Sequence, residues 1–221
     1  MLTRTLTPQE YQAITALHAI GPLSGWEWMA AFDTNAIDLI TFCTDRHPCG
    51  VGADAALLAH WAAGGRCIVH HNHLSGESLS NKDWGALVSQ PADEIFAHTD
   101  DGSIFQGLIV DRPGMAAALG KWRDATNAAD AAFMAAMPPL PNLLNLTNQL
   151  SKHLLGSALA RRGLATYAYE LGPSWSALVA AYPGAIARGV SAAGAVLQTE
   201  MPLSAACAGR LRTNLPRVRR R

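Results

Sequence analysis

Through the first half of the chain, apolar positions recur first at helical spacing and then at strand spacing, in an order that repeats. Segments with an apolar residue every three or four positions alternate with short runs rich in β-branched and aromatic residues, and Gly, Pro, Asn and Asp separate them. The expected elements are a helix from Pro8, capped by Thr7, to about Gly21-Pro22, a hairpin of 26–32 and 36–42, a helix at 53–63, a strand at 66–71, a helix from Ser80 to about Gln90, and a hairpin of 94–99 and 103–110. This order predicts an α/β layered domain.

The pattern changes after Pro113-Gly114. Strand-like runs vanish, alanine becomes abundant, and leucines at 143, 146, 150, 154 and 155 recur at helical spacing. We therefore expect several helices over 113–205, and an α/β fold followed by an all-helical C-terminal region.

Composition is that of a folded protein with a sizeable core. The chain has 221 residues, of which 49% are hydrophobic and 15% charged, which excludes a disordered or collagenous protein. Its four cysteines form no Cys-x-x-Cys pair and are interpreted as reduced, mostly buried thiols. No secretory signal or membrane-spanning stretch is recognised, so a cytoplasmic protein without membrane contact is expected.

Charge is distributed unevenly although it balances overall at 17 basic and 17 acidic residues. Most acids precede residue 113, and six arginines fall within 210–221, which is expected to be a mobile tail. The two halves could dock on each other, copies could pair head to tail, or the basic half could bind an anionic partner. Plain solvation explains the charges equally well.

The segment from His70 to Trp84 carries the candidate chemistry. His71 and His73 stand two apart at the end of an expected strand, where both side chains face the same way. Asp83 lies in the first turn of the next helix and could add one carboxylate oxygen. Two histidines, an aspartate and a water would make an open tetrahedral zinc site of the catalytic type.

Each part of this pattern also has an ordinary structural explanation. A His-x-His pair on its own is more often surface histidine than a ligand pair. Ser80-x-x-Asp83 is equally a helix cap, which would stabilise a helix start without any catalysis. The two interpretations of Asp83 are compatible, because a cap would also hold its carboxylate in place.

Taken together, these residues resemble the JAMM (MPN-plus) zinc metalloproteases, and His71-Asn72-His73-Leu74-Ser75-Gly76 is especially similar to the bacterial RadC-type branch. The resemblance covers roughly residues 8–112. It implies a curved mixed sheet flanked by helices, and a division into a JAMM/MPN-like domain at 1–112, a helical region at 113–209 and the arginine-rich tail at 210–221.

The resemblance also implies residue roles. The family's zinc ligands fall on His71, His73 and Asp83, with one zinc ion per chain, and its oxyanion-supporting serine falls on Ser80. The family's catalytic glutamate lies well upstream, near the start of a strand that follows the first helix. Glu27 occupies that place and is the only acid between Glu10 and Asp33.

Two positions depart from the family pattern. Leu74 replaces a proline, which removes no ligand. Six residues separate His73 from Ser80, one fewer than the family usually has, so the positions of Ser80 and Asp83 are the most sensitive part of the comparison. Glu77 is a spare carboxylate that could take the place of Asp83.

The function expected from the resemblance is hydrolysis of a peptide or isopeptide bond, such as one joining a ubiquitin-like protein to a lysine. A zinc-activated water would attack, with Glu27 as the general base. The partners expected are a protein or peptide substrate and a second copy or another protein bound through the helical region. The alternative is a RadC-like accessory protein that binds nucleic acid through its basic C-terminal region.

Overall fold

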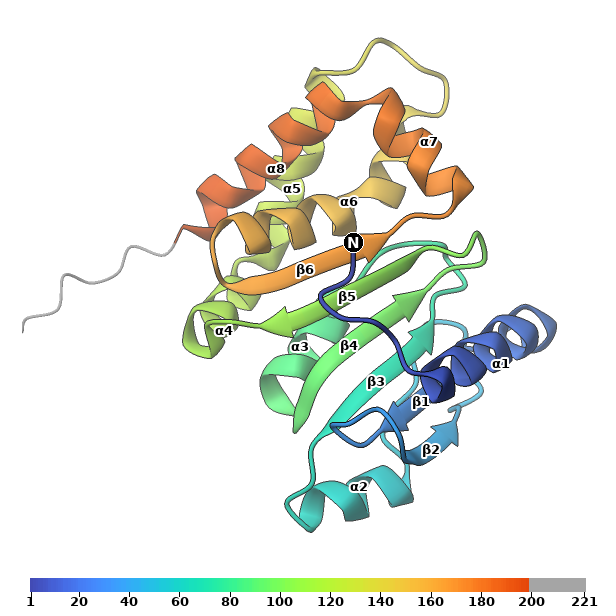
Figure 1. Ribbon diagram of the computed structural model, residues 1–221. Helices are drawn as coiled ribbons and strands as arrows, with labels where there is room; N and C mark the ends of the chain where they lie inside the picture. Colours follow the sequence, from blue (N-terminus) through green and yellow to red (C-terminus); the bar gives the residue numbers. More distant parts are fainter. Residues whose placement is uncertain (199–221) are drawn as a thin grey trace, which may run out of the picture.

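A six-stranded mixed sheet forms the centre of the molecule, in the strand order β2-β1-β3-β4-β5-β6 (Figure 1). The computed structural model describes residues 1–198. The strands are β1 (Met29–Phe32), β2 (Leu39–Cys43), β3 (Cys67–Asn72), β4 (Ala92–His98), β5 (Ile104–Ile109) and β6 (Ala165–Glu170). The helices are α1 (Pro8–Ser24), α2 (Ala55–Ala62), α3 (Asn81–Ser89), α4 (Arg112–Gly120), α5 (Trp122–Ala135), α6 (Leu143–Arg161), α7 (Pro173–Ala181) and α8 (Pro183–Leu197).

Local sequence signals explain most of the element boundaries up to β5. Thr7 and Glu10 form a reciprocal capping box at the start of α1. The expected end of this helix at Gly21-Pro22 was wrong, because the helix continues to Ser24. Pro22 lies in the last turn, and Gly25, at φ +70°, closes the helix by donating its N–H to the Gly21 carbonyl.

The central strand β3 is buried on both faces. It pairs antiparallel with β1 and parallel with β4, and the crossover to β4 contains α3. Alternation along the strand sends Val69 and His71 to the face that packs against α2, α3 and the C-terminal helices, and Ile68 and His70 to the face that packs against α1. The two neighbouring histidines therefore lie in different environments.

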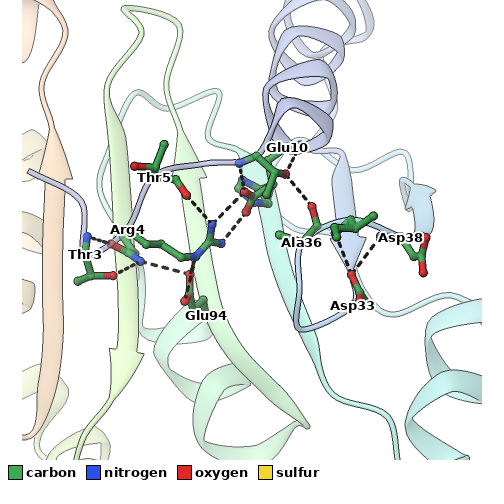
Figure 2. A network of polar contacts seen from close by, with 12 residues as sticks. Thr3, Arg4, Thr5, Glu10, Asp33, Ala36, Asp38 and Glu94 are labelled. Carbon is green, nitrogen blue, oxygen red and sulfur yellow. Dashed lines mark hydrogen bonds and ion pairs between the residues drawn. The ribbon is translucent and has the colours of Figure 1, made fainter.

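On the α1 face, a polar network ties the N-terminal segment to the sheet (Figure 2). The Arg4 guanidinium donates to both oxygens of Glu10, at 2.9 and 2.6 Å, and to Glu94. The fully buried Glu10 carboxylate also lies 3.0 Å from Nε2 of His70, whose Nδ1 is 3.0 Å from His98. Buried charge is compensated here by bonds from at least two partners.

The region after residue 112 is not all helical, so that expectation was wrong. β6 pairs antiparallel with β5 along its whole length and adds a sixth strand to the sheet. Thr166, Tyr167 and Tyr169 suit a pleated surface, and without β6 the peptide groups of β5 would be left unpaired on that side.

Helices α5, α6 and α8 pack together on one side of this enlarged sheet (Figure 1). A single hydrophobic cluster extends from Met29 of β1 through Phe105 of β5 to Leu197 of α8. The two parts of the chain therefore share one core.

The remaining sequence expectations concern the C-terminal tail, the cysteines and contact with a membrane. The arginine-rich segment 210–221 and Cys207 lie outside the described residues. The three described cysteines are unbridged, but only Cys67 is buried, whereas Cys43 is half-buried and Cys49 exposed. Over residues 1–198, no helix combines the length and apolar character needed to cross a membrane.

Candidate metal centre

The end of β3 brings two imidazoles together. His71 is the fifth residue of the strand, and His73 extends the pairing with β4 by donating its backbone N–H to the His98 carbonyl at 2.7 Å. Their Nε2 atoms lie 2.8 Å apart, and both residues are buried, at 4% and 5% exposure. The expected convergence of alternate side chains is therefore present.

Asp83 reaches the same point from the first turn of α3. Its Oδ1 lies 3.2 Å from Nε2 of His71, and its Oδ2 lies 3.5 Å from Nε2 of His73. The same carboxylate accepts the backbone N–H of Ser80 at 2.6 Å, which completes a capping box at the start of the helix. Asp83 is thus a helix cap and a member of the histidine group at once.

These three side chains suit a divalent metal such as zinc. Each offers one ligand atom, and the three atoms lie within 4.8 Å of one another. Nitrogens bound to tetrahedral zinc would be about 3.3 Å apart, so the imidazoles need to separate only slightly. Nδ1 of His73 can donate to the Glu77 carbonyl at 2.9 Å, which leaves the Nε2 lone pair facing the group. Nδ1 of His71 is buried and has no partner within residues 1–198.

Electrostatics couple the three groups. Burial alone would favour the neutral acid, but His71 and His73 hold the pKa of Asp83 well below its usual range. Burial likewise opposes protonation of His73, yet its bond to Asp83 raises the pKa of this imidazole above the usual value. Asp83 is therefore in the charged form that a metal ligand requires, and the two imidazoles would have to be neutral at Nε2 to bind the same ion.

Glu27 lies beside this group, two residues before β1 begins. Its N–H donates to the His47 carbonyl at 2.9 Å, and its carbonyl accepts the Thr44 hydroxyl at 2.6 Å. The side-chain oxygen of Asn72, the residue between the two histidines, accepts the N–H of Trp28, which follows Glu27, at 2.7 Å. Glu27 is 9% exposed, and burial raises the pKa of its carboxyl despite the opposing effect of the nearby histidines.

Ser80 and Glu77 have separate roles at the edge of the group. The Ser80 hydroxyl accepts the Asp83 N–H at 3.4 Å as part of the helix cap. Glu77 instead pairs with Lys152 of α6 at 2.5 Å, so Asp83, and not Glu77, stands beside the histidines. The shorter loop between His73 and Ser80 still allows this placement.

A cavity of about 630 Å³ joins all five expected site residues. Glu27, His71, His73, Ser80 and Asp83 lie in its wall. Its remaining wall is mostly apolar, with Met29, Val69 and Ile95 from the sheet face and residues of α2 and α3. The arrangement can hold one metal ion, with a buried carboxyl beside it, at the wall of a cavity of ordinary ligand size.

Sequence reasoning missed the residues that hold the loop between the ligands. Besides Lys152 on Glu77, the Tyr167 hydroxyl lies 2.6 Å from the Ser78 hydroxyl, and Nε1 of Trp175 donates to the Gly76 carbonyl at 2.9 Å. These anchors come from α6, β6 and α7, far from the motif in sequence. The Tyr167-Ala-Tyr169 alternation after Gly163 is a signal that could have indicated a strand, although not a site, and the prediction of helices over 113–205 overlooked it.

Comparison with known proteins adds no assignment. The chain matches no model of a known protein family, and no curated protein is similar to it at a significant level. The geometry of the site is therefore the basis for any functional conclusion.

Proposed function

We propose that the chain is a zinc-dependent hydrolase of the JAMM type that cleaves a peptide or isopeptide bond. The observation that carries this proposal is the convergence of His71, His73 and Asp83 on one point beside the buried carboxyl of Glu27. The α/β fold, with a mixed sheet flanked by helices, is compatible with an MPN-like domain. A ubiquitin-like conjugate is one member of the proposed substrate class.

His71, His73 and Asp83 would hold the ion, and bound zinc lowers the pKa of a water molecule towards neutrality. Glu27 is suited to take the proton of that water, because burial raises the pKa of its carboxyl above the usual value and makes the carboxylate a better proton acceptor. As the water oxygen added to the amide carbon and the C–N bond broke, Glu27 would hold the proton taken from the water and pass it to the leaving nitrogen. The Ser80 hydroxyl would donate to the oxyanion.

Metal content is the first test. Protein purified without added metal is expected to contain close to one zinc ion per chain by mass spectrometry. A His71→Ala/His73→Ala variant should lose the metal while keeping the far-ultraviolet spectrum of the folded chain. A His18→Ala/His60→Ala variant changes as many histidines outside the group and should keep it. A wild-type chain that holds no metal even after zinc is supplied would contradict the proposal.

Glu27→Gln separates metal binding from chemistry. The amide cannot accept a proton, so this variant should bind zinc like the wild type but cleave amide substrates about 10²–10⁴-fold more slowly. The readout is turnover on a panel of fluorogenic peptides and ubiquitin-like conjugates, alongside zinc content. Turnover that survives unchanged would remove Glu27 from the mechanism.

A further inference from the structure

The wall of the cavity beside the candidate metal centre contains both polar and apolar side chains. Its polar part contains the metal ligands and Glu27, whereas the rest is formed largely by apolar side chains. Met29, Val69 and Ile95 come from β1, β3 and β4 and are at most 7% exposed. The face of the sheet thus forms an apolar part of the cavity wall. This part adjoins the candidate ligand His71, because Met29 is its partner in the pairing of β1 with β3.

Two helices complete the apolar part. Leu57, Leu58 and Trp61 of α2 line it, together with Ala86 of α3. Leu58 is 54% exposed, so this side of the apolar part is open to solvent and a bound group could bury further Leu58 surface. The segment 48–53 also lines the cavity, and Nζ of Lys82 connects it to α3 by donating to the Cys49 carbonyl at 3.3 Å.

Several polar and charged side chains of the cavity wall already have partners within the protein. Lys152 pairs with Glu77, Lys82 with the Cys49 carbonyl, and Asp83 with the histidines. A charged ligand group placed against Leu57, Trp61 and Val69 would lose its hydration without gaining a partner from these side chains. An apolar group would instead bury its surface against the sheet and against Leu58.

We propose that the substrate of this site is an amide whose carbonyl carries a bulky apolar group, aliphatic or aromatic, which binds in the pocket formed by Leu57, Leu58, Trp61 and Ala86. The inference rests on the proposed function, because the amide carbonyl must lie at the metal end of the cavity. A group attached to that carbonyl then extends into the apolar remainder, which a conjugate joined through a glycine carbonyl would leave empty, so such conjugates are expected to be weaker substrates. The cavity volume of about 630 Å³ suits a compact side chain or acyl group.

Binding of two hydroxamates to the zinc-loaded protein tests the pocket without measuring activity. 3-Phenylpropionohydroxamate and acetohydroxamate share the metal-binding head and differ in the apolar group. Calorimetric titration should show the phenyl compound binding about tenfold or more tightly, since its ring becomes buried. Equal affinities would overturn the proposal.

Two variants locate the effect. Ala86→Phe should fill the pocket and abolish the preference for the phenyl compound while leaving acetohydroxamate binding and zinc content unchanged. Leu58→Ser, at a half-exposed position that folding should tolerate, should reduce the preference. Ala59→Phe and Leu144→Ser are the matched controls, because both positions are exposed and lie outside the cavity wall. A preference that persists in both pocket variants would place the phenyl group elsewhere.

The outcomes distinguish this inference from the proposed function. Tighter binding of the phenyl compound without hydrolysis of any amide would contradict the proposed hydrolase function but would still support the apolar pocket. Should the protein bind no zinc, N-acetylphenylalaninamide and N-acetylglycinamide are compared by chemical-shift changes at the Trp61 indole and the Leu58 methyl groups. Shifts caused only by the phenylalanine compound support the pocket, and equal or absent shifts overturn it.

Discussion

At the scale of single residues, neighbouring histidines in one strand have opposite roles. His71 faces a carboxylate and another imidazole at the metal group, whereas His70 is enclosed between Phe96 and Glu10 on the other face. Burial, the largest influence, lowers the pKa of His70 despite Glu10. The sheet's two-residue alternation, and not the residue type, decides which histidine is available for a ligand.

The buried carboxylate of Glu10 should make the fold sensitive to acid. Burial alone would raise its pKa, but bonds from Arg4, His70 and the Thr7 backbone hold the pKa of Glu10 at about 2, against 4.5 ordinarily. Since the folded value is the lower one, the stabilisation is fully present above pH about 4.5 and is lost as the pH falls towards 2.

Glu10→Gln should therefore lower the free energy of unfolding at pH 7 by about 1–3 kcal/mol and flatten its decline between pH 4.5 and 2. Urea unfolding followed by circular dichroism at several pH values measures both effects. The exposed Gln9→Glu variant adds a carboxylate nearby as a control and should leave the acid decline intact. An acid decline that is the same in Glu10→Gln and wild type would show that other groups cause it.

At the scale of elements, the loop at 74–79 is held from outside the motif. Tyr167 of β6 is bonded to Ser78 of the loop and, at 2.9 Å, to Nδ1 of His153 of α6. The Glu77 carboxylate accepts a hydrogen bond from Nζ of Lys152, and the Glu77 carbonyl lies within hydrogen-bond distance of Nδ1 of His73. The loop that orients the candidate ligand His73 is thus held in place by hydrogen bonds from the C-terminal elements.

Tyr167→Phe should weaken zinc binding by several-fold up to about tenfold, because the loop loses the hydroxyl that fixes Ser78. The measurement is competition with a chelator of known affinity. Tyr169→Phe, on the same strand and in the same aromatic cluster, is the matched control and should bind zinc like the wild type. Equal affinities of the two variants would show that the loop keeps its shape without this bond.

The sequence allowed the elements up to β5 to be predicted, because caps, glycine stops and alternating patterns are local signals. β6 was not predicted, because residues 165–170 lie in an alanine-rich stretch between helices and because the pairing of β6 with β5 is long-range. The histidine pair and Asp83 could be found for the same local reason. Lys152, Tyr167 and Trp175 could not, because only the folded chain brings them to the loop.

At the scale of the whole molecule, one sheet contains strands from both the acidic and the basic half of the chain. The acidic first half supplies five strands and the basic second half the sixth, and one apolar cluster crosses the boundary near residue 112. Phe105 of β5, fully buried, stacks with Tyr167 of β6 and meets Trp175 of α7 edge to face. The expected helical region is therefore structurally bound to the site.

A fragment of residues 1–112 should fail to fold cooperatively, because β5 would lose its partner strand and Phe105 and Trp84 would lose the cover of Tyr167. Thermal melting and amide-proton NMR dispersion of the fragment test this. The full chain is the control and should show a single sharp melting transition. A sharp melting transition of the 1–112 fragment would refute the expectation.

The anchoring of the loop has a consequence for the order of events during synthesis. His71, His73 and Asp83 leave the ribosome together, but Trp175, which bonds Gly76, follows about a hundred residues later. Translation at about 5–20 residues per second separates the two by several seconds. Throughout that interval the nascent chain carries the candidate ligands without the bonds that hold the loop between them, so the site is completed only when the C-terminal elements have docked.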